Sequence, residues 1–234
     1  MNTDLGNQGA FYRFALDVGE GAHVICRAAV LPRQSFAARV VEQKTRDNAE
    51  FAVQDIARRT GATVAINGGR FNGAFAPDGL LIVDGQTIGH KRADWIGYVT
   101  IDDAGNASVT DKPDLASARY ALQGDPLIIE PGGKMGMIRE DNQRFRRSII
   151  AQSGDLIIAM VTTPVSLFSL AYALLENPHA LFLTHVDAAL NLSGAATTSF
   201  FAKFPDRTQI VVQARWPNRS VITFTARRSS ASNM

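Results

Sequence analysis

The sequence has little cysteine. Cys26 is the only cysteine in the 234 residues, so no disulfide can form within the chain. No Cys-x-x-Cys pair or Cys/His group has the spacing that structural zinc requires. Apolar neighbours at Val24, Ile25 and Ala28 indicate that Cys26 is a structural thiol inside a strand.

An excess of charge and long apolar runs are also absent. The 24 basic and 22 acidic residues nearly cancel, which argues against a nucleic-acid-binding protein with a broad basic surface. Nineteen basic residues are Arg and five are Lys; Arg suits bidentate binding of phosphate or carboxylate, although a general composition bias explains the same ratio. No run reaches 18 apolar residues, so we expect no membrane span.

The polar segment Met1–Gln8 does not resemble a signal peptide. Two alternatives therefore stay open for the compartment: the protein remains in the cytoplasm, or a leader has been removed from this chain.

Histidine is scarce as well, with four residues spread along the chain. One has a possible metal-binding partner, because His185 and Asp187 would share a face if they lie on a strand. A solvated or core histidine is the favoured interpretation. We therefore expect no cofactor, and a divalent metal is left open.

Apolar patterning predicts many strands and two helices. Helical spacing predicts one helix through Ala49, Ala52, Val53, Ile56 and Ala57, capped by Thr45 or Asp47 and followed by Gly61, and a second over 166–176. The predicted strands are residues 11–17, 22–31, 36–42, 62–66, 80–86, 95–101, 107–110, 127–130, 148–152, 155–161, 189–192, 210–214 and 221–226.

These elements predict the fold class α+β: a single domain with a mixed β-sheet and two or more covering helices. We expect a flexible N-terminus over residues 1–10, the domain over residues 11–226, and a disordered tail over residues 227–234.

Two short segments have the residues of a ligand site. Asn67-Gly68-Gly69-Arg70-Phe71 and Asn191-Leu192-Ser193-Gly194 each follow a buried apolar run. A strand that ends in Asn and small residues exposes backbone N–H groups and an amide at a sheet edge, where glycine permits close approach. The pair predicts one ligand site built from both halves of the chain. Two ordinary glycine turns are the alternative.

Five signatures together resemble the phosphodiester glycosidase family. The family's Asn-Gly-Gly-Phe-Phe is similar to residues 67–71, its Gly-Leu-x-x-x-Asp-Gly hairpin to 79–85, and its Gly-x-Pro-x-Leu to 124–128. Its Arg-Thr strand start is similar to Arg147-Ser148, and its Asn-Leu-Asp-Gly-Gly-Gly-Ser to 191–197. The resemblance covers residues 11–226. It implies a glycosidase-type hydrolase acting outside the cytoplasm, with bacterial relatives associated with exopolysaccharide biosynthesis.

The departures from the family pattern bear on catalysis. Ser193 stands where the family has an Asp, Ala195 and Ala196 replace two glycines, and Arg70 replaces the first Phe. Loss of that carboxylate removes a candidate metal ligand, nucleophile or acid/base group, so the resemblance leaves open whether the protein is active.

The candidate site follows from these motifs. Arg147 is the first candidate for a phosphate contact, Asp125 is the best substitute for the missing acid, and Asp78 and Asp187 are weaker candidates. Thr197 and Thr198 either line the pocket or bond within their own turn. The candidate catalytic positions are Asp125, Arg147 and Ser193; the candidate substrate-binding positions are Asn67, Gly68, Gly69, Arg70, Ser148, Asn191, Gly194, Thr197 and Thr198.

Three functions are consistent with the sequence. The leading hypothesis is a hydrolase that cleaves a sugar-1-phosphodiester or a related cell-surface glycan linkage. The second is a catalytically impaired relative that binds a glycan or anionic ligand. The third is an interaction module with an exposed apolar face over residues 167–175. The expected partner is a carbohydrate or sugar phosphate, with no nucleic acid and an oligomeric state left open.

Overall fold

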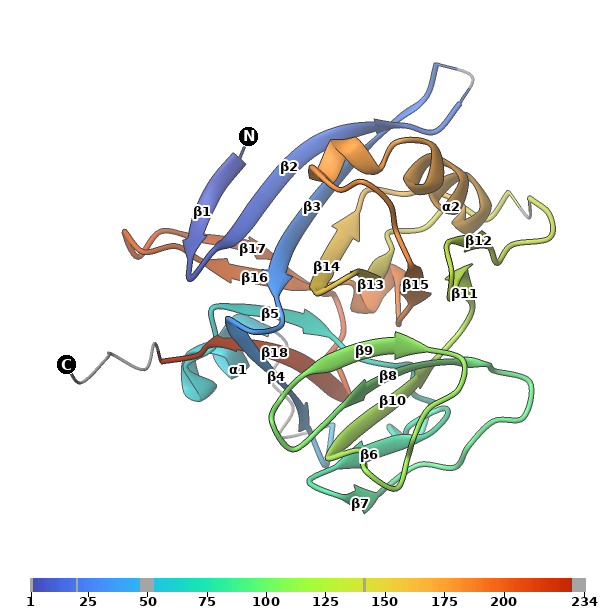
Figure 1. Ribbon diagram of the computed structural model, residues 1–234. Helices are drawn as coiled ribbons and strands as arrows, with labels where there is room; N and C mark the ends of the chain where they lie inside the picture. The colour runs from blue at the N-terminus through green and yellow to red at the C-terminus, as the bar shows by residue number, and fades with distance from the viewer. Residues whose placement is uncertain (1, 20, 47–52, 141, 229–234) are drawn as a thin grey trace.

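The computed structural model describes residues 2–19, 21–46, 53–140 and 142–228. Within these ranges the strands form three sheets, one of eight strands and two of five (Figure 1). Every strand pair described is antiparallel. The motifs predicted from the sequence lie where strands of different sheets end.

The eight-stranded sheet combines the first three strands of the chain with five strands that lie between residues 127 and 191. Its order is β1-β2-β3-β14-β13-β15-β11-β12. In that order the strands are Asn2–Gly6, Gly9–Asp17, His23–Pro32, Leu156–Thr162, Ser148–Ser153, Ala188–Asn191, Leu127–Glu130 and Lys134–Met135.

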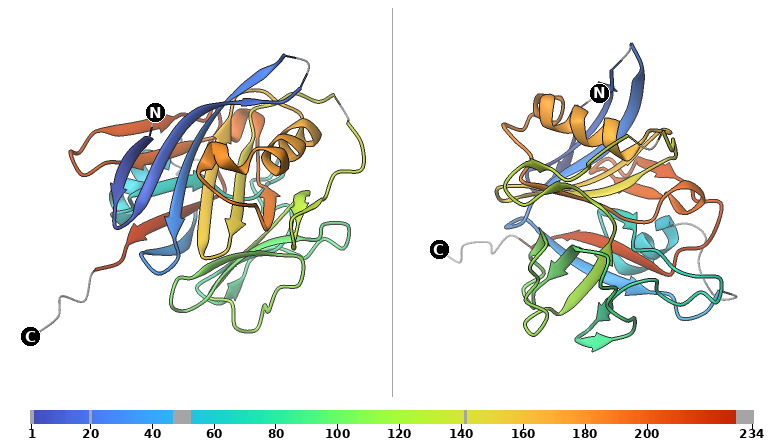
Figure 2. Two further views of the ribbon diagram at one scale, coloured as in Figure 1. Left: turned by 45° about the horizontal axis from the view of Figure 1, so that its top comes forward. Right: turned by 90° about the vertical axis from the view of Figure 1, so that its right-hand side faces the viewer.

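The two five-stranded sheets lie on one side of the eight-stranded sheet (Figures 1 and 2). In the order β17-β16-β5-β18-β4, the strands are Gln209–Val212, Phe200–Lys203, Val64–Asn67, Ser220–Ala226 and Phe36–Glu42. In the order β7-β6-β10-β8-β9, they are Gln86–Thr87, Leu81–Val83, Tyr120–Gly124, Gly97–Ile101 and Ala107–Thr110.

Short helices cover local parts of the outer faces. The helix α1 spans Val53–Thr60 and α2 spans Leu167–Glu176; the 3₁₀ helices η1 and η2 span Pro178–Leu181 and Ala195–Thr197. Ser166 caps α2 by accepting a hydrogen bond from the Ser169 N–H. The apolar side of α2 packs on the outer face of the eight-stranded sheet, so the predicted face over residues 167–175 is largely internal.

The largest core lies between the sheets. Alternation along the strands places one set of side chains inward, such as Phe36, Ala38 and Val40 of β4. All three sheets contribute to this core, including Phe200 of β16 and Ile150 of β13. Burial of these faces against one another holds the ends of the sheets together, and the candidate site forms there.

The predicted α+β fold class is wrong. The described chain is mostly β, with three antiparallel sheets in place of one mixed sheet, and its two α-helices have eight and ten residues. The strands Tyr120–Gly124 and Phe200–Lys203, which the sequence analysis did not predict, lie inside the two smaller sheets. Because one sheet covers another, most of the apolar surface needs no helix to bury it.

Several local predictions are confirmed. The hairpin around Asp84-Gly85 joins β6 to β7, and both turn residues have positive φ angles, as a tight hairpin turn requires. Gly61 also has a positive φ directly after α1. The predicted helical positions Ala49 and Ala52 and the cap Asp47 lie outside the described residues.

Both terminal segments lie partly within the described residues. Residues 2–6, within the segment expected to be flexible, form β1 and pair with β2, and Leu5 is buried. Of the tail expected to be disordered, residues 229–234 lie outside the described residues.

Candidate functional site

The two motifs meet in the structure. Strand β5 ends at Asn67 and β15 ends at Asn191, in different sheets. The Asn67 Nδ2 donates to the Ser193 carbonyl at 3.0 Å, and the Ser193 N–H donates to the Gly68 carbonyl at 3.2 Å. Segments about 120 residues apart in the chain are thus joined by two direct hydrogen bonds.

Asn67 is the buried centre of this junction. Its Oδ1 accepts from the Ser148 hydroxyl at 2.7 Å and from the Ser199 N–H at 3.0 Å. Its Nδ2 also lies 3.2 Å from the Gly68 carbonyl, and the side chain has no exposed surface. The amide is fully used within the protein, so Asn67 and Ser148 connect strands at this site.

The two glycines after Asn67 differ in whether their backbone N–H groups are free to bind a ligand. The Gly68 N–H donates to the Ser220 carbonyl at 2.8 Å, and a Cβ at Gly68 would lie 2.3 Å from the Ser220 Oγ. Gly69 is partly exposed, and its N–H has no hydrogen-bond partner among the described residues. Gly69 is therefore the glycine of this motif whose N–H can meet a ligand.

The second motif is a compact turn held by its own hydroxyls. The Ser193 and Thr197 hydroxyl oxygens lie 2.6 Å apart, and the Thr197 hydroxyl donates to the Gly194 carbonyl at 2.8 Å. The Thr198 hydroxyl donates to the Arg146 carbonyl at 3.2 Å. All three side chains are buried, so of the two roles left open for Thr197 and Thr198 the structure shows bonding within and around the turn.

Asp125 brings a carboxylate to the start of this motif. Its backbone carbonyl accepts from the Asn191 Nδ2 at 2.7 Å. The carboxyl group is half-buried and has no hydrogen-bond partner among the described residues. Burial raises the pKa of the Asp125 carboxyl; the charge of Arg70 opposes this, the Asp94 charge adds to it, and the Arg92 charge opposes it.

Asn191 has a second feature that points to a ligand. Its Oδ1 is buried and lacks a partner among the described residues, although its Nδ2 is bonded to Asp125. A buried acceptor without a donor destabilises the folded protein, and a hydroxyl or N–H of a ligand would supply the donor.

Arg70 and Arg92 both lie against Trp95. Their Cζ atoms are 5.4 Å and 4.9 Å from the ring centre. Arg92 is paired with Asp94 at 2.8 Å and with Asp78 at 3.1 Å. Arg70 is exposed and forms no ion pair with a described residue, so its charge is the one available near Asp125.

Gln123 fixes the loop that carries Arg92 and Trp95, and no motif in the sequence indicated this role. The buried amide Oε1 accepts from the Leu80 N–H at 3.1 Å and the Arg92 N–H at 2.9 Å. Its Nε2 donates to the Arg92 and Trp95 carbonyls, each at 2.7 Å. The available signal was its place two residues before Asp125, at the end of an apolar run.

The Arg147 side chain points away from the junction of the two motifs. Its Nε donates to the Val165 carbonyl at 2.9 Å, its Nη2 donates to the Gln143 carbonyl, and the guanidinium lies over the Phe145 ring. The next residue, Ser148, faces Asn67 because successive side chains in an extended chain alternate in direction. The structure therefore brings Ser148, but not the Arg147 guanidinium, to the junction of the motifs.

The remaining candidate carboxylates have other partners. Asp78 pairs with Arg92, and Asp187 pairs with His185 at 3.0 Å and accepts from the Gly154 N–H. Within the described ranges, no three His, Cys, Asp or Glu side chains gather as a metal site. No helix in the same ranges is long and apolar enough to cross a membrane.

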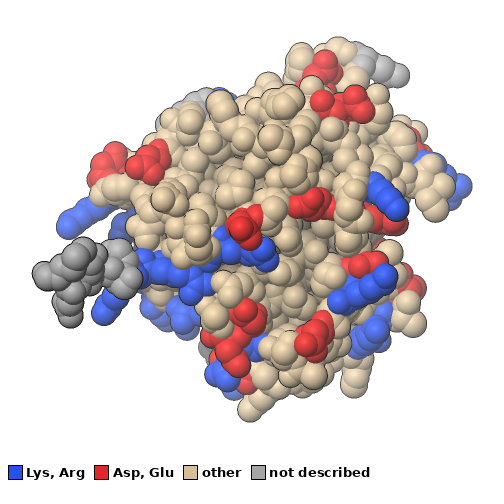
Figure 3. Space-filling view, in the orientation of Figure 1, with Lys and Arg blue, Asp and Glu red and all other residues tan. Residues whose placement is uncertain are grey.

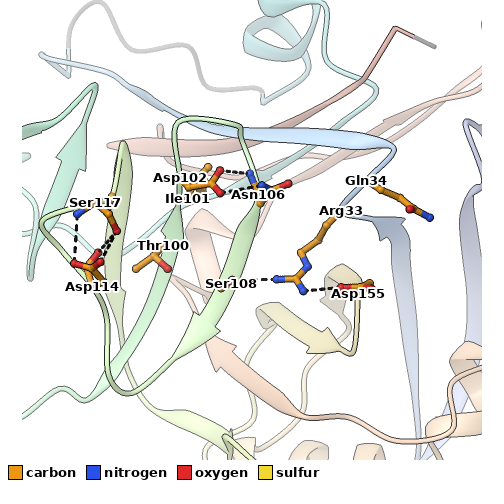
Figure 4. A pocket seen from close by; sticks show the side chains of 11 residues that line it. Arg33, Gln34, Thr100, Ile101, Asp102, Asn106, Ser108, Asp114, Ser117 and Asp155 are labelled. Atoms are coloured by element: carbon orange, nitrogen blue, oxygen red, sulfur yellow. Dashed lines mark hydrogen bonds and ion pairs between the residues drawn. The ribbon is translucent and has the colours of Figure 1, made fainter. Parts of the chain in front are cut away.

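A separate hollow in the surface lies away from Asp125 and the two motifs. It has a volume of about 460 Å³ and is lined by residues that include Arg33, Thr100, Asp102 and Asp155 (Figure 4). Arg33 pairs with Asp155 at 2.8 Å, and Asp102 accepts from Asn106 at 2.8 Å, so its charges are satisfied internally. It lies at the far end of β8 from Gly97, which pairs with Gly124.

The surface agrees with the charge balance of the sequence. On the face in Figure 3, both basic and acidic side chains occur, and acidic side chains border the basic ones near the centre. The charged groups around Asp125 follow the same pattern, with Arg70 and Arg92 beside Asp94 and Asp125.

Comparison with known proteins gives one family. The model of the phosphodiester glycosidase family matches residues 60–226, more than two thirds of the chain. This range contains both motifs, Gln123 and Asp125. No curated protein sequence matches the chain.

Solved structures show a similar fold. The catalytic domain of zebrafish N-acetylglucosamine-1-phosphodiester alpha-N-acetylglucosaminidase, auto-inhibited by its pro-peptide, has a TM-score of 0.67 at 13% identity, covering 97% of this chain and 87% of that one. A hypothetical protein from Synechocystis has a TM-score of 0.64 at 15% identity, covering 94% of this chain and 62% of its own, so the chain spans less than two thirds of that protein.

Proposed function

The chain belongs to the phosphodiester glycosidase family, and from this we propose that it is a hydrolase that cleaves a sugar-1-phosphodiester or a related linkage in a cell-surface glycan. The observation that carries the proposal is the half-buried Asp125 carboxyl, with a raised pKa and no bonded partner among the described residues, beside the available charge of Arg70. The activity named for the zebrafish neighbour is of the same type.

The leaving group determines which groups the reaction needs. Hydrolysis breaks the bond between the anomeric carbon and the phosphate oxygen, and the phosphate departs with one more negative charge. A phosphate ester is a weak base, so holding its charge matters more than protonating it. We assign this role to the Arg70 guanidinium and the Gly69 N–H, which lie on the same motif and are not otherwise paired in the described chain.

Asp125 then acts as the general base. A water molecule attacks the anomeric carbon, Asp125 takes one of its protons, and the sugar is released with a free hydroxyl. Burial makes this carboxylate a stronger base than an ordinary Asp, because it raises the pKa. A single carboxylate is sufficient in this scheme, which is compatible with Ser193 in place of the family's Asp.

We assign the orientation of the sugar to Asn191, whose side-chain amide is bonded to Asp125. The buried Oδ1 of Asn191, without a donor among the described residues, would accept a hydrogen bond from a sugar hydroxyl. Gln123 contributes indirectly, because it holds the backbone of Trp95, whose ring lies under the Arg70 guanidinium.

The test is sugar release from a panel of glycosyl phosphodiesters. Asp125→Asn keeps the shape of the side chain and removes the base, so we expect kcat to fall by about 100-fold or more. Asp114→Asn, in the hollow of Figure 4, is the matched control and should keep the wild-type rate. Equal rates for Asp125→Asn and wild type, or no sugar release from any phosphodiester, would refute the proposal.

Ser193 favours a second candidate, a relative that binds glycan without efficient turnover. The Ser193 hydroxyl is buried against Thr197 and offers no carboxylate to the site. On this hypothesis the wild-type protein binds a glycosyl phosphodiester without cleaving it, and Ser193→Asp creates or strongly increases cleavage. Wild-type turnover that Ser193→Asp does not improve would exclude it.

A further inference from the structure

Three arginines gather at the end of the second motif that is away from Asp125. The Arg146 Nη2 donates to the Thr198 carbonyl at 2.6 Å and to the Gln213 carbonyl at 3.1 Å. The Arg215 N–H donates to the Ala196 carbonyl at 2.6 Å. Both residues are therefore tied to the turn that contains η2.

The third arginine reaches the same place from the eight-stranded sheet. Val161 of β14 pairs with Arg27 of β3 on one side and with Ser148 of β13 on the other. Paired residues share a face of a sheet, so Arg27 and Ser148 point to the same side. Arg146 comes two residues before Ser148, on the approach to β13.

These positive charges act on one another. Burial lowers the pKa of Arg146, and the charges of Arg215 and Arg27 lower it further. In the described part of the chain, no ion pair joins Arg27, Arg146 or Arg215 to a carboxylate. Like charges held together are unfavourable, and a bound anion reverses the sign of the interaction.

An aromatic side chain follows the arginines. Trp216 is 62% exposed, and its backbone N–H donates to the Ala196 carbonyl at 3.2 Å. An exposed tryptophan that directly follows Arg215 in the chain provides a flat apolar surface, which suits a ligand with both an apolar ring face and an anionic substituent. A phosphorylated sugar has both.

We propose that Arg27, Arg146 and Arg215 form a second anion-binding subsite, which holds a phosphate group on a neighbouring residue of the glycan. Asp125 meets the second motif at Asn191, and Arg146 meets it at Ala195 and Thr198. A glycan chain that crosses this motif therefore reaches both places. The assignment of the ligand as part of the substrate rests on the proposed function; the anion site itself rests on the arginines.

The experiment measures binding to the subsite without turnover. Isothermal titration at low salt uses glucose 6-phosphate, with glucose and inorganic phosphate as the comparison probes. The Arg70→Gln variant is titrated, so that binding beside Asp125 is reduced and the three arginines supply the signal. We expect glucose 6-phosphate to bind about tenfold more tightly than either comparison probe.

Substitutions then locate the binding. Adding Arg215→Gln or Arg27→Gln should each raise Kd about tenfold, since each removes one charge-assisted contact. Arg215 is exposed, so Arg215→Gln is compatible with folding, and Arg27→Lys should restore part of the affinity by restoring charge. Arg228→Gln, beyond the far end of β18, is the matched control and should leave Kd unchanged.

The outcomes separate this inference from the proposed function. Kd values unchanged by both Arg215→Gln and Arg27→Gln, or no binding of glucose 6-phosphate, would overturn the subsite. Inorganic phosphate binding as tightly as glucose 6-phosphate would overturn its assignment to a glycan. Loss of hydrolysis in Asp125→Asn with titration unchanged supports both, whereas binding without any hydrolysis in wild type supports the subsite and refutes the proposed function.

Discussion

Asn67 offers the sharpest test of how the site is assembled. Its side chain joins three segments that are distant in the chain, through Ser148, Ser193 and Ser199. We interpret it as the connection that holds the two motifs together, rather than as a group that touches substrate. Asn67→Ala removes that connection while it leaves the β5 backbone intact.

The expected magnitude follows from the groups left behind. In Asn67→Ala, the Ser148 hydroxyl, the Ser199 N–H and the Ser193 carbonyl lose the partner that the amide provides. The Gly68 carbonyl keeps the Ser193 N–H. At about 1–3 kcal/mol for each buried polar group left without a partner, with partial relaxation, we expect about 3–5 kcal/mol of lost stability.

The assay is equilibrium unfolding in urea, with a thermal scan as the second measurement. For a domain of this size, a loss of about 3–5 kcal/mol corresponds to a fall in Tm of roughly 6–20 °C. Ser148→Ala removes one of the two bonds to Oδ1 and leaves the Ser199 N–H in place, so about 1 kcal/mol is expected. Asn72→Ala, in an exposed loop with local bonds only, is the control and should cost less than about 1 kcal/mol.

A small effect would contradict this reasoning. If Asn67→Ala lost no more stability than Asn72→Ala, the bonds at Asn67 would not connect the motifs energetically. If Asn67→Ala kept full stability but lost substrate binding, Asn67 would be a ligand contact, as the sequence motif predicts.

The remaining predictions concern Asp125 and its surroundings. Arg70→Gln removes a charge that lowers the Asp125 pKa, so it should move the acid limb of the pH–rate profile to higher pH. Asp94→Asn removes a charge that raises this pKa and should move the acid limb to lower pH. Shifts in the same direction for both variants would refute the electrostatic account. Because the Asp125 pKa is raised in the folded protein, the carboxyl stabilises the fold at pH values below its unfolded-state pKa, and this contribution is lost as the pH rises through its folded-state pKa. At neutral pH the buried charge therefore costs stability, and Asp125→Asn should be more stable than wild type in urea unfolding. Gly124→Ala would place a Cβ 2.7 Å from the Asn191 carbonyl oxygen, and we expect a loss of about 1–3 kcal/mol; unchanged stability would show that the strands separate freely there.

Local elements were predictable because their signals are local. The strand predicted over residues 36–42 has the same bounds as β4, and the helix predicted over 166–176 begins one residue later as α2 with Ser166 as its cap. Alternation and helical spacing act over a few residues, and each is visible in one segment of the chain. The missed strands β10 and β16 are runs of five and four residues, and Leu122 and Phe200 within them are buried in the core that the three sheets share.

The candidate site was likewise predictable only where its signals are local in the sequence. The Asn-Gly-Gly and Asn-Leu-Ser-Gly segments indicated that two strand ends form one location, and the structure joins them through Asn67 and Ser193. The sequence could not indicate that the Arg147 guanidinium bonds to the Val165 carbonyl, because side-chain direction depends on the face that each strand buries. It also could not indicate that Gln123 holds the loop around Arg92.

The sequence by itself determined the family, the strand-rich order of the elements and the two motifs, since these depend on residue type and spacing along the chain. Tertiary structure decided that sheets cover one another, that Asn67 is enclosed, and that Asp125 has a raised pKa beside Arg70. Burial and charge proximity arise from contacts between segments far apart in the chain, and no local pattern encodes them.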